Sequence, residues 1–187
     1  MGLNDPPQET ALVERVRRMT EVNPTPTVSI VGRASLDRMN LIEKLVPRLK
    51  SLGYRIAVVK HDVHGFEMDR EGKTTWRYSK AGSDVVIISS STKMALIRQT
   101  GRELSLAEIE EYVRGSVDLL ITDGYLSGDK PKIEVSREPE SKDILCSLPE
   151  LIAVVSEGHY NLNIPQFAMD DINSLAEFII DRFLVKK

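Results

Sequence analysis

Short apolar runs alternate with amphipathic stretches along most of the chain. The runs are rich in β-branched residues and predict buried strands at Thr27–Val31, Tyr54–Lys60, Asp84–Ser89, Val117–Thr122 and Glu150–Ser156. Apolar residues at helical spacing predict helices from Leu41 to about Gly53 and at Lys73–Lys80, Ser105–Val113 and Asp171–Leu184. Weaker patterns predict a strand at Lys93–Arg98 that pairs with Asp84–Ser89, and an edge strand at Lys132–Ser136.

Strands without a polar face need cover on both sides of their sheet, and the alternating helices supply it. The sequence therefore predicts an α/β fold with a doubly wound, mostly parallel sheet flanked by helices. Residues 27–187 form one predicted domain. Residues 1–26 form an N-terminal extension with prolines at both ends and a helix near Glu9–Glu21. In such sheets ligands bind at the carboxyl ends of the strands, so the residues that follow each strand are the candidates for a binding site.

Composition narrows the function classes. The 187 residues include 25 Lys+Arg and 28 Asp+Glu, so no basic excess indicates nucleic-acid binding. No apolar run reaches the length of about 18 residues that a membrane helix needs. The start lacks the basic and apolar regions of a secretory signal. The single cysteine, Cys146, excludes an intrachain disulfide and fits a reducing compartment. We therefore expect a cytoplasmic protein.

The segment after the first strand has the position and length of a phosphate-binding loop, which needs Gly, four residues, Gly-Lys and Ser or Thr. It reads Gly32, Arg33, Ala34, Ser35, Leu36, Asp37, Arg38, Met39, Asn40. Asp37 replaces the second Gly and would repel a phosphate, and Met39 offers magnesium no oxygen. Arg33 and Arg38 could still hold an anion at the helix N-terminus. The alternative is a strand–turn–helix corner with Asp37 as N-cap and no ligand.

Two further strand ends carry polar residues. The candidate anion or cofactor pocket after the second strand comprises Lys60, His61, His64, Asp69 and Lys73. His61 and His64 with Asp62 or Asp69 could in principle bind a metal, but a full ligand set is not evident, so anion or cofactor handling is preferred. The strand at Val117–Thr122 ends in Asp123 and Gly124, where a P-loop fold presents the carboxylate on its magnesium side.

From Thr27 to Phe183 the chain resembles the molybdopterin-guanine dinucleotide biosynthesis adapter protein family, MobB. The resemblance is carried by Val58-Val59-Lys60-His61, His64-Gly65-Phe66, Asp69, Gly72-Lys73, Ala81-Gly82 and Asp118–Tyr125. It implies a P-loop NTPase-like fold, typically dimeric, that binds GTP and assists the enzyme attaching GMP to molybdopterin. By this resemblance Gly32 begins the phosphate loop, Asp123 lies near magnesium, and the Lys60–Lys73 pocket receives nucleotide or pterin.

The altered loop leaves two functions open. One is an accessory protein of molybdenum cofactor biosynthesis, binding GTP with Mg²⁺, or molybdopterin, beside the molybdenum cofactor guanylyltransferase. The other is a non-catalytic pseudo-NTPase scaffold that binds a partner enzyme or the pterin cofactor. Arg38 and Met39 at the Lys and hydroxyl positions limit any GTPase activity to a weak one, and no catalytic residue is identified. A homodimer without membrane or nucleic-acid contacts is expected in either case.

Overall fold

The computed structural model describes residues 24–137 and 144–187. Contacts divide these residues into two compact units: the first runs to His61 and resumes at Ile109, and the second comprises Asp62–Glu108. The helix predicted at Glu9–Glu21 lies outside the described residues. The single domain expected over 27–187 stays a prediction.

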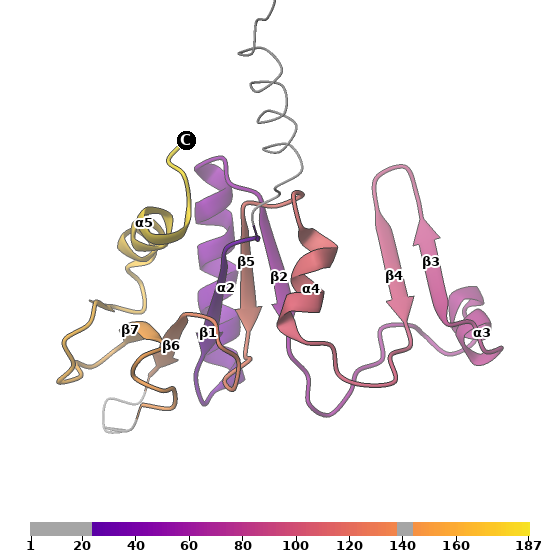
Figure 1. Cartoon of the computed structure of the whole chain (residues 1–187), viewed down its shortest axis with the longest axis horizontal. Helices are drawn as coiled ribbons and strands as arrows, with labels where there is room; N and C mark the ends of the chain where they lie inside the picture. Colours follow the sequence, from indigo (N-terminus) through magenta and orange to yellow (C-terminus); the bar gives the residue numbers. More distant parts are fainter. Residues whose placement is uncertain (1–23, 138–143) are drawn as a thin grey trace, which may run out of the picture. The chain divides into compact units, whose positions relative to one another are not determined.

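The first unit is built on a six-stranded sheet in which neighbouring strands are parallel (Figure 1). The strand order is β2-β5-β1-β6-β7-β8. The strands are β1 (Thr27–Val31), β2 (Ile56–Lys60), β5 (Leu119–Asp123), β6 (Lys132–Ser136), β7 (Leu151–Ser156) and β8 (Gln166–Phe167). The predicted mostly parallel α/β sheet flanked by helices is confirmed.

Both faces of this sheet are apolar. On one face, helices α2 (Ser35–Ser51) and α5 (Ile172–Phe183) pack together. Their buried residues form one core with the strands, including Val28, Ile30, Leu45, Leu49, Ile121, Ile133, Leu175 and Ile179. Side chains alternate along a strand, so Val31 and Val154 point to the opposite face and join a smaller cluster with Cys146 and Tyr160. Each fully buried aliphatic side chain contributes about 1.5–3 kcal/mol.

The prediction of an edge strand at Lys132–Ser136 is wrong, because β6 lies between β1 and β7. Two charged residues alternate with apolar ones there, as they would in a half-exposed strand, yet both are buried. The ammonium of Lys132 lies 2.8 Å from the Glu150 carboxylate. The Glu134 carboxylate accepts hydrogen bonds from the backbone N–H and the thiol of Cys146. Because buried partners compensate both charges, the central strand β6 can carry the alternating polar and apolar pattern that is usual for an edge strand.

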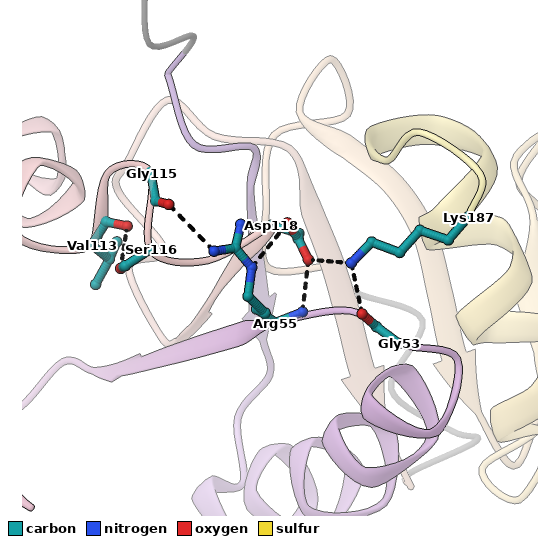
Figure 2. Close-up of polar contacts among 7 residues, drawn as sticks. All are labelled: Gly53, Arg55, Val113, Gly115, Ser116, Asp118 and Lys187. Carbon is teal, nitrogen blue, oxygen red and sulfur yellow. Dashed lines mark hydrogen bonds and ion pairs between the residues drawn. The ribbon is translucent and has the colours of Figure 1, made fainter. Parts of the chain in front are cut away.

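At the amino edge of this sheet, Asp118 ties three parts of the first unit together (Figure 2). Its carboxylate accepts hydrogen bonds from the backbone and guanidinium of Arg55, at the start of β2. The Lys187 ammonium lies 2.8 Å from the same carboxylate and donates to the Gly53 carbonyl at 2.6 Å. Hydrogen bonds from Arg55 first, and then from Lys187, hold the pKa of Asp118 well below its usual range.

The second unit contains helix α3 (Thr74–Lys80) and an antiparallel ribbon of β3 (Val85–Ser89) and β4 (Met94–Arg98). The predicted pairing of these strands is confirmed. Ile87 lies opposite Leu96 on the ribbon. The prediction of a buried strand at Asp84–Ser89 is wrong, because β3 pairs, among the described strands, only with β4, in a two-stranded sheet of its own. Large apolar side chains stay exposed on this ribbon: Ile87, Ile88, Met94 and Leu96.

Helix α4 (Leu106–Val113) begins at the predicted capping box. The Glu108 carboxylate accepts a hydrogen bond from the Ser105 N–H at 2.9 Å, and the Glu108 N–H donates to the Ser105 hydroxyl at 3.3 Å. Hydrogen bonds from Arg102 and Ser105 lower the pKa of Glu108 to about 2. Across the described ranges, no helix combines the length and apolarity needed to cross a bilayer.

Candidate functional site

The carboxyl ends of β2, β5 and β1 bring several predicted site residues to one edge of the sheet. In strand register Lys60 lies beside Asp123, and Asp123 lies beside Ile30. The His61 N–H donates a hydrogen bond to the Asp123 carbonyl at 3.0 Å. Because β1 continues directly into Gly32, the altered loop starts at the same edge.

Gly32 ends β1 where the chain passes close to β6. A Cβ at this position would lie 2.3 Å from the Val135 carbonyl oxygen, so only glycine fits without a shift of the backbone. Helix α2 begins at Ser35 with Ala34 as its N-cap, earlier than the apolar periodicity predicts. The prediction of Asp37 as N-cap is therefore wrong. Asp37 lies in the first turn of the helix, where the positive end of the helix dipole stabilises its negative charge.

Arg38, in the first turn of α2, binds to the corner between β1 and α2 and to β5 beside it. Its Nε lies 2.7 Å from Asp123 Oδ1, and its Nη1 donates a hydrogen bond to the Gly32 carbonyl at 2.6 Å. The Arg38 and Asp123 side chains are only 16% and 11% exposed. The guanidinium thus spans from the end of β5 to the first residue of the loop and neutralises the carboxylate there.

A second ion pair joins the corner to the next two strands. The buried Asp37 carboxylate lies 2.7 Å from Nε of Arg137, directly after β6. Nη1 of Arg137 lies 3.6 Å from Glu157, directly after β7. The charge of Asp37 is therefore paired within the protein. The other loop residues surround these two pairs: Arg33, Ala34, Ser35, Leu36 and Met39 are exposed and Asn40 is half-buried.

Two features of this corner count against a magnesium–nucleotide complex, although the expectation of GTP and Mg²⁺ stays a prediction. Asp123, which the resemblance places near magnesium, is engaged by Arg38. Met39 offers a thioether where a hard cation needs oxygen. Over 24–137 and 144–187, the structure has no group of three or more His, Cys, Asp or Glu that could hold a metal ion.

Tyr125 is a site residue that the sequence did not single out. It is the one non-glycine residue with a positive φ, 61°, in the part of the chain that the structure describes. Its ring stacks on His61 with centroids 4.5 Å apart and planes inclined by 24°. A left-handed backbone costs a residue of this kind roughly 1–2 kcal/mol, and an aromatic pair supplies about 0.5–1.5 kcal/mol. The stack therefore does little more than offset the strain.

Hydrogen bonds hold the Tyr125 turn from several directions. The Gly124 N–H donates to the Ile30 carbonyl at 3.0 Å, and the Gly128 N–H donates to the Tyr125 carbonyl at 3.1 Å. The Thr122 hydroxyl donates to the Gly124 carbonyl at 3.1 Å. A Cβ on Gly124 would lie 3.4 Å from the His61 Cβ, so glycine lets the two strand ends approach. The dipeptide Asp-Gly signals a turn in the sequence, but no pattern signals the ring contact.

The remaining predicted pocket residues belong to the second unit. His64 and Lys73 are exposed and Asp69 is half-buried. The Asp62 carboxylate accepts a hydrogen bond from the His64 N–H, and Lys73 is the N-cap of α3. Exposed apolar side chains share this loop: Val63, Phe66 and Met68. That His64, Asp69 and Lys73 join Lys60 and His61 in one pocket stays a prediction.

Comparisons with known proteins agree on one family. The profile of MobB, described as "Molybdopterin guanine dinucleotide synthesis protein B", matches residues 27–157. The molybdopterin-guanine dinucleotide biosynthesis adapter protein of Haemophilus influenzae is 31% identical over 160 residues, which cover 84% of this chain and 89% of that protein. The Escherichia coli adapter protein is 27% identical, covering 83% and 92%.

Solved structures lead to the same family. A crystal structure of molybdopterin-guanine biosynthesis protein B superposes with a TM-score of 0.69 at 30% sequence identity, covering 83% of this chain and 97% of that one. The Bacillus subtilis MobB structure, at 22% identity and a TM-score of 0.68, supports the fold. The chain therefore belongs to the MobB family.

Proposed function

We propose that this protein is an accessory protein of molybdenum cofactor biosynthesis, acting as a non-catalytic adapter in the formation of molybdopterin guanine dinucleotide. Membership of the MobB family and the names of its relatives support the pathway. The Arg38–Asp123 ion pair supports the absence of GTP turnover. In this proposal the pterin cofactor and the guanylyltransferase, in place of magnesium–GTP, are the binding partners.

The ion pair argues against magnesium–GTP because the nucleotide would have to break it. A magnesium ion near Asp123 would displace the Arg38 guanidinium from a hydrogen bond of 2.7 Å. The Asp37 carboxylate adds little repulsion toward a phosphate, because Arg137 already balances its charge. The charged hydrogen bond that is lost contributes about 1.5–3 kcal/mol, which would lower the affinity for magnesium–GTP by about 10-fold or more.

A GTP titration with and without Mg²⁺, followed by isothermal calorimetry, tests this proposal. We expect no saturable magnesium-dependent binding up to about 1 mM GTP. The variant Asp37→Gly/Arg38→Lys/Met39→Thr should bind GTP more tightly than the parent, because it restores a glycine, a lysine and a hydroxyl. Saturable magnesium-dependent binding by the parent would refute the proposal. An unchanged affinity in the triple variant would show that the corner is not a modified phosphate loop.

The adapter role has its own test. Purified guanylyltransferase should form molybdopterin guanine dinucleotide faster when this protein is present, although the protein itself releases no phosphate from GTP. Equal rates with and without the protein would contradict an accessory role. We also propose a cytoplasmic location, in keeping with the free and buried Cys146.

We further propose that the chain forms a homodimer through its β3–β4 ribbon. A two-stranded ribbon is marginally stable in water, and this one exposes Ile87 and Leu96 as an apolar pair. In sedimentation equilibrium, Ile87→Lys should shift the protein toward monomer. The matched control Leu148→Lys changes an exposed leucine of the first unit and should keep the dimer. A monomeric parent would exclude this dimer.

A further inference from the structure

We infer that the stacked side chains of His61 and Tyr125 form a binding surface for a planar heteroaromatic ring, a purine or a pterin. The inference rests on the proposed function, in which the pterin cofactor is bound in place of magnesium–GTP. It assigns the ring of that ligand to two named side chains.

The position of the pair supports this assignment. His61 follows β2 and Tyr125 follows β5 by two residues, so both lie at the carboxyl edge of a parallel sheet, where such folds bind ligands. The rings are stacked, and both side chains are half-buried, so each retains exposed surface. Flat aromatic faces bind nucleobase-like rings by stacking with little dependence on charge.

The backbone supports it independently. Tyr125 is held at a φ of 61° by hydrogen bonds at Gly124 and Gly128, although a tyrosine avoids this conformation. The ring contact with His61 does little more than offset this strain in the free protein. Strain that the surroundings enforce is concentrated at binding sites, where it fixes a side chain for a ligand.

The electrostatics of the neighbouring residues select the ligand class. Arg38 neutralises Asp123, which immediately precedes the Gly124-Tyr125 turn. Arg38 is therefore taken up by Asp123, and a ligand at this edge gains less from a phosphate contact with Arg38 and more from contacts with its ring.

Neutral probes test the ring surface without involving the corner. Guanosine and 6-hydroxymethylpterin are titrated into the full chain, and the H8 proton of guanosine or the H7 proton of the pterin is followed by NMR. We expect a saturable upfield shift of the ring proton, as stacking on an aromatic face produces. The probe with the lower Kd identifies the ring as purine or pterin.

Variants at Tyr125 separate binding from structure. Tyr125→Asn removes the ring but suits a positive φ, so it should fold at least as stably as the parent and lose about 5-fold or more in affinity. Tyr125→Phe keeps the ring and should stay within about 2-fold. Tyr112→Leu alters an exposed tyrosine of α4 and serves as the control.

Three results would overturn the inference: no saturable binding of either probe to the parent at about millimolar concentration, parent-like affinity in Tyr125→Asn, or an equal loss in Tyr112→Leu. If the protein still accelerates guanylyltransferase and ignores magnesium–GTP, only the ring surface is lost and the adapter role stands. Ring binding accompanied by magnesium-dependent GTP binding would instead overturn the proposed function.

Discussion

Replacing Arg38 by Met removes the guanidinium but leaves an unbranched side chain on α2. The change eliminates the hydrogen bond to Asp123 at 2.7 Å and the one to the Gly32 carbonyl at 2.6 Å. Hydrogen bonds that involve a charged group contribute about 1.5–3 kcal/mol each. Asp123, 11% exposed, would then be a carboxylate without its counter-ion. We expect the free energy of unfolding to fall by about 3 kcal/mol.

Urea unfolding followed by far-ultraviolet circular dichroism measures this loss. Asp123→Asn should cost less, because the amide oxygen still accepts a hydrogen bond from Arg38. The double variant Arg38→Met/Asp123→Asn should lose less stability than the sum of the two single losses, and the difference, the coupling energy, should be about 2 kcal/mol. Arg33→Met, an exposed arginine of the same loop, is the control and should stay within about 0.5 kcal/mol of the parent.

A loss below about 0.5 kcal/mol in Arg38→Met would refute the reasoning. The pair would then behave like a solvated surface ion pair. The corner would be open to a phosphate at little cost, and the argument against magnesium–GTP would fail with it. A loss that disappears in 1 M NaCl would lead to the same conclusion, because salt screens exposed pairs far more than buried ones.

Three further outcomes follow from the structure. Gly32→Ala should destabilise the fold by about 2 kcal/mol or more, because its Cβ would meet the Val135 carbonyl, whereas Gly101→Ala, in open space, should stay within about 0.5 kcal/mol in urea. The pKa of Asp118 is lowered in the fold, so its contribution to the free energy of unfolding is complete above about pH 5 and is lost as the pH falls toward 2. The difference in stability between the parent and Asp118→Asn should therefore shrink over that range. Burial raises the pKa of Cys146 to about 12, so at pH 8 roughly one thiol in ten thousand is ionised, and a disulfide reagent should label it only after unfolding; rapid labelling of the folded chain would contradict this burial.

The sequence predicted β1, β5 and β7 well because their apolar runs are buried on both faces. Val28, Ile30 and Ile121 are fully buried and belong to short, continuous apolar runs, which are typical of strands covered on both faces. It failed at β6, because a buried Lys132 with a partner and an exposed lysine look the same in a sequence. Only the pairing of strands distinguishes them.

The sequence predicted where the candidate site lies in the sheet, but it could not predict the contacts between the side chains there. The order of the strands placed Asp123 and Lys60 at the same edge as the loop, as expected for a parallel sheet. The sequence also showed that Arg38 and Met39 replace a lysine and a hydroxyl. It could not show that Arg38 turns back onto Asp123, because this depends on the distance between α2 and β5. The His61–Tyr125 stack depends likewise on two strand ends far apart in the chain.

The place of β1 in the sheet has a consequence for biosynthesis. The neighbours of β1 (Thr27–Val31) in the sheet are β5 and β6. The residues that pair with β1 lie between Leu120 and Glu134, far later in the chain. On the ribosome this apolar segment emerges before its hydrogen-bonding partners, and it remains without them while about ninety further residues are translated. Slow synthesis or a scarcity of chaperones would therefore expose this strand to aggregation before its sheet can form.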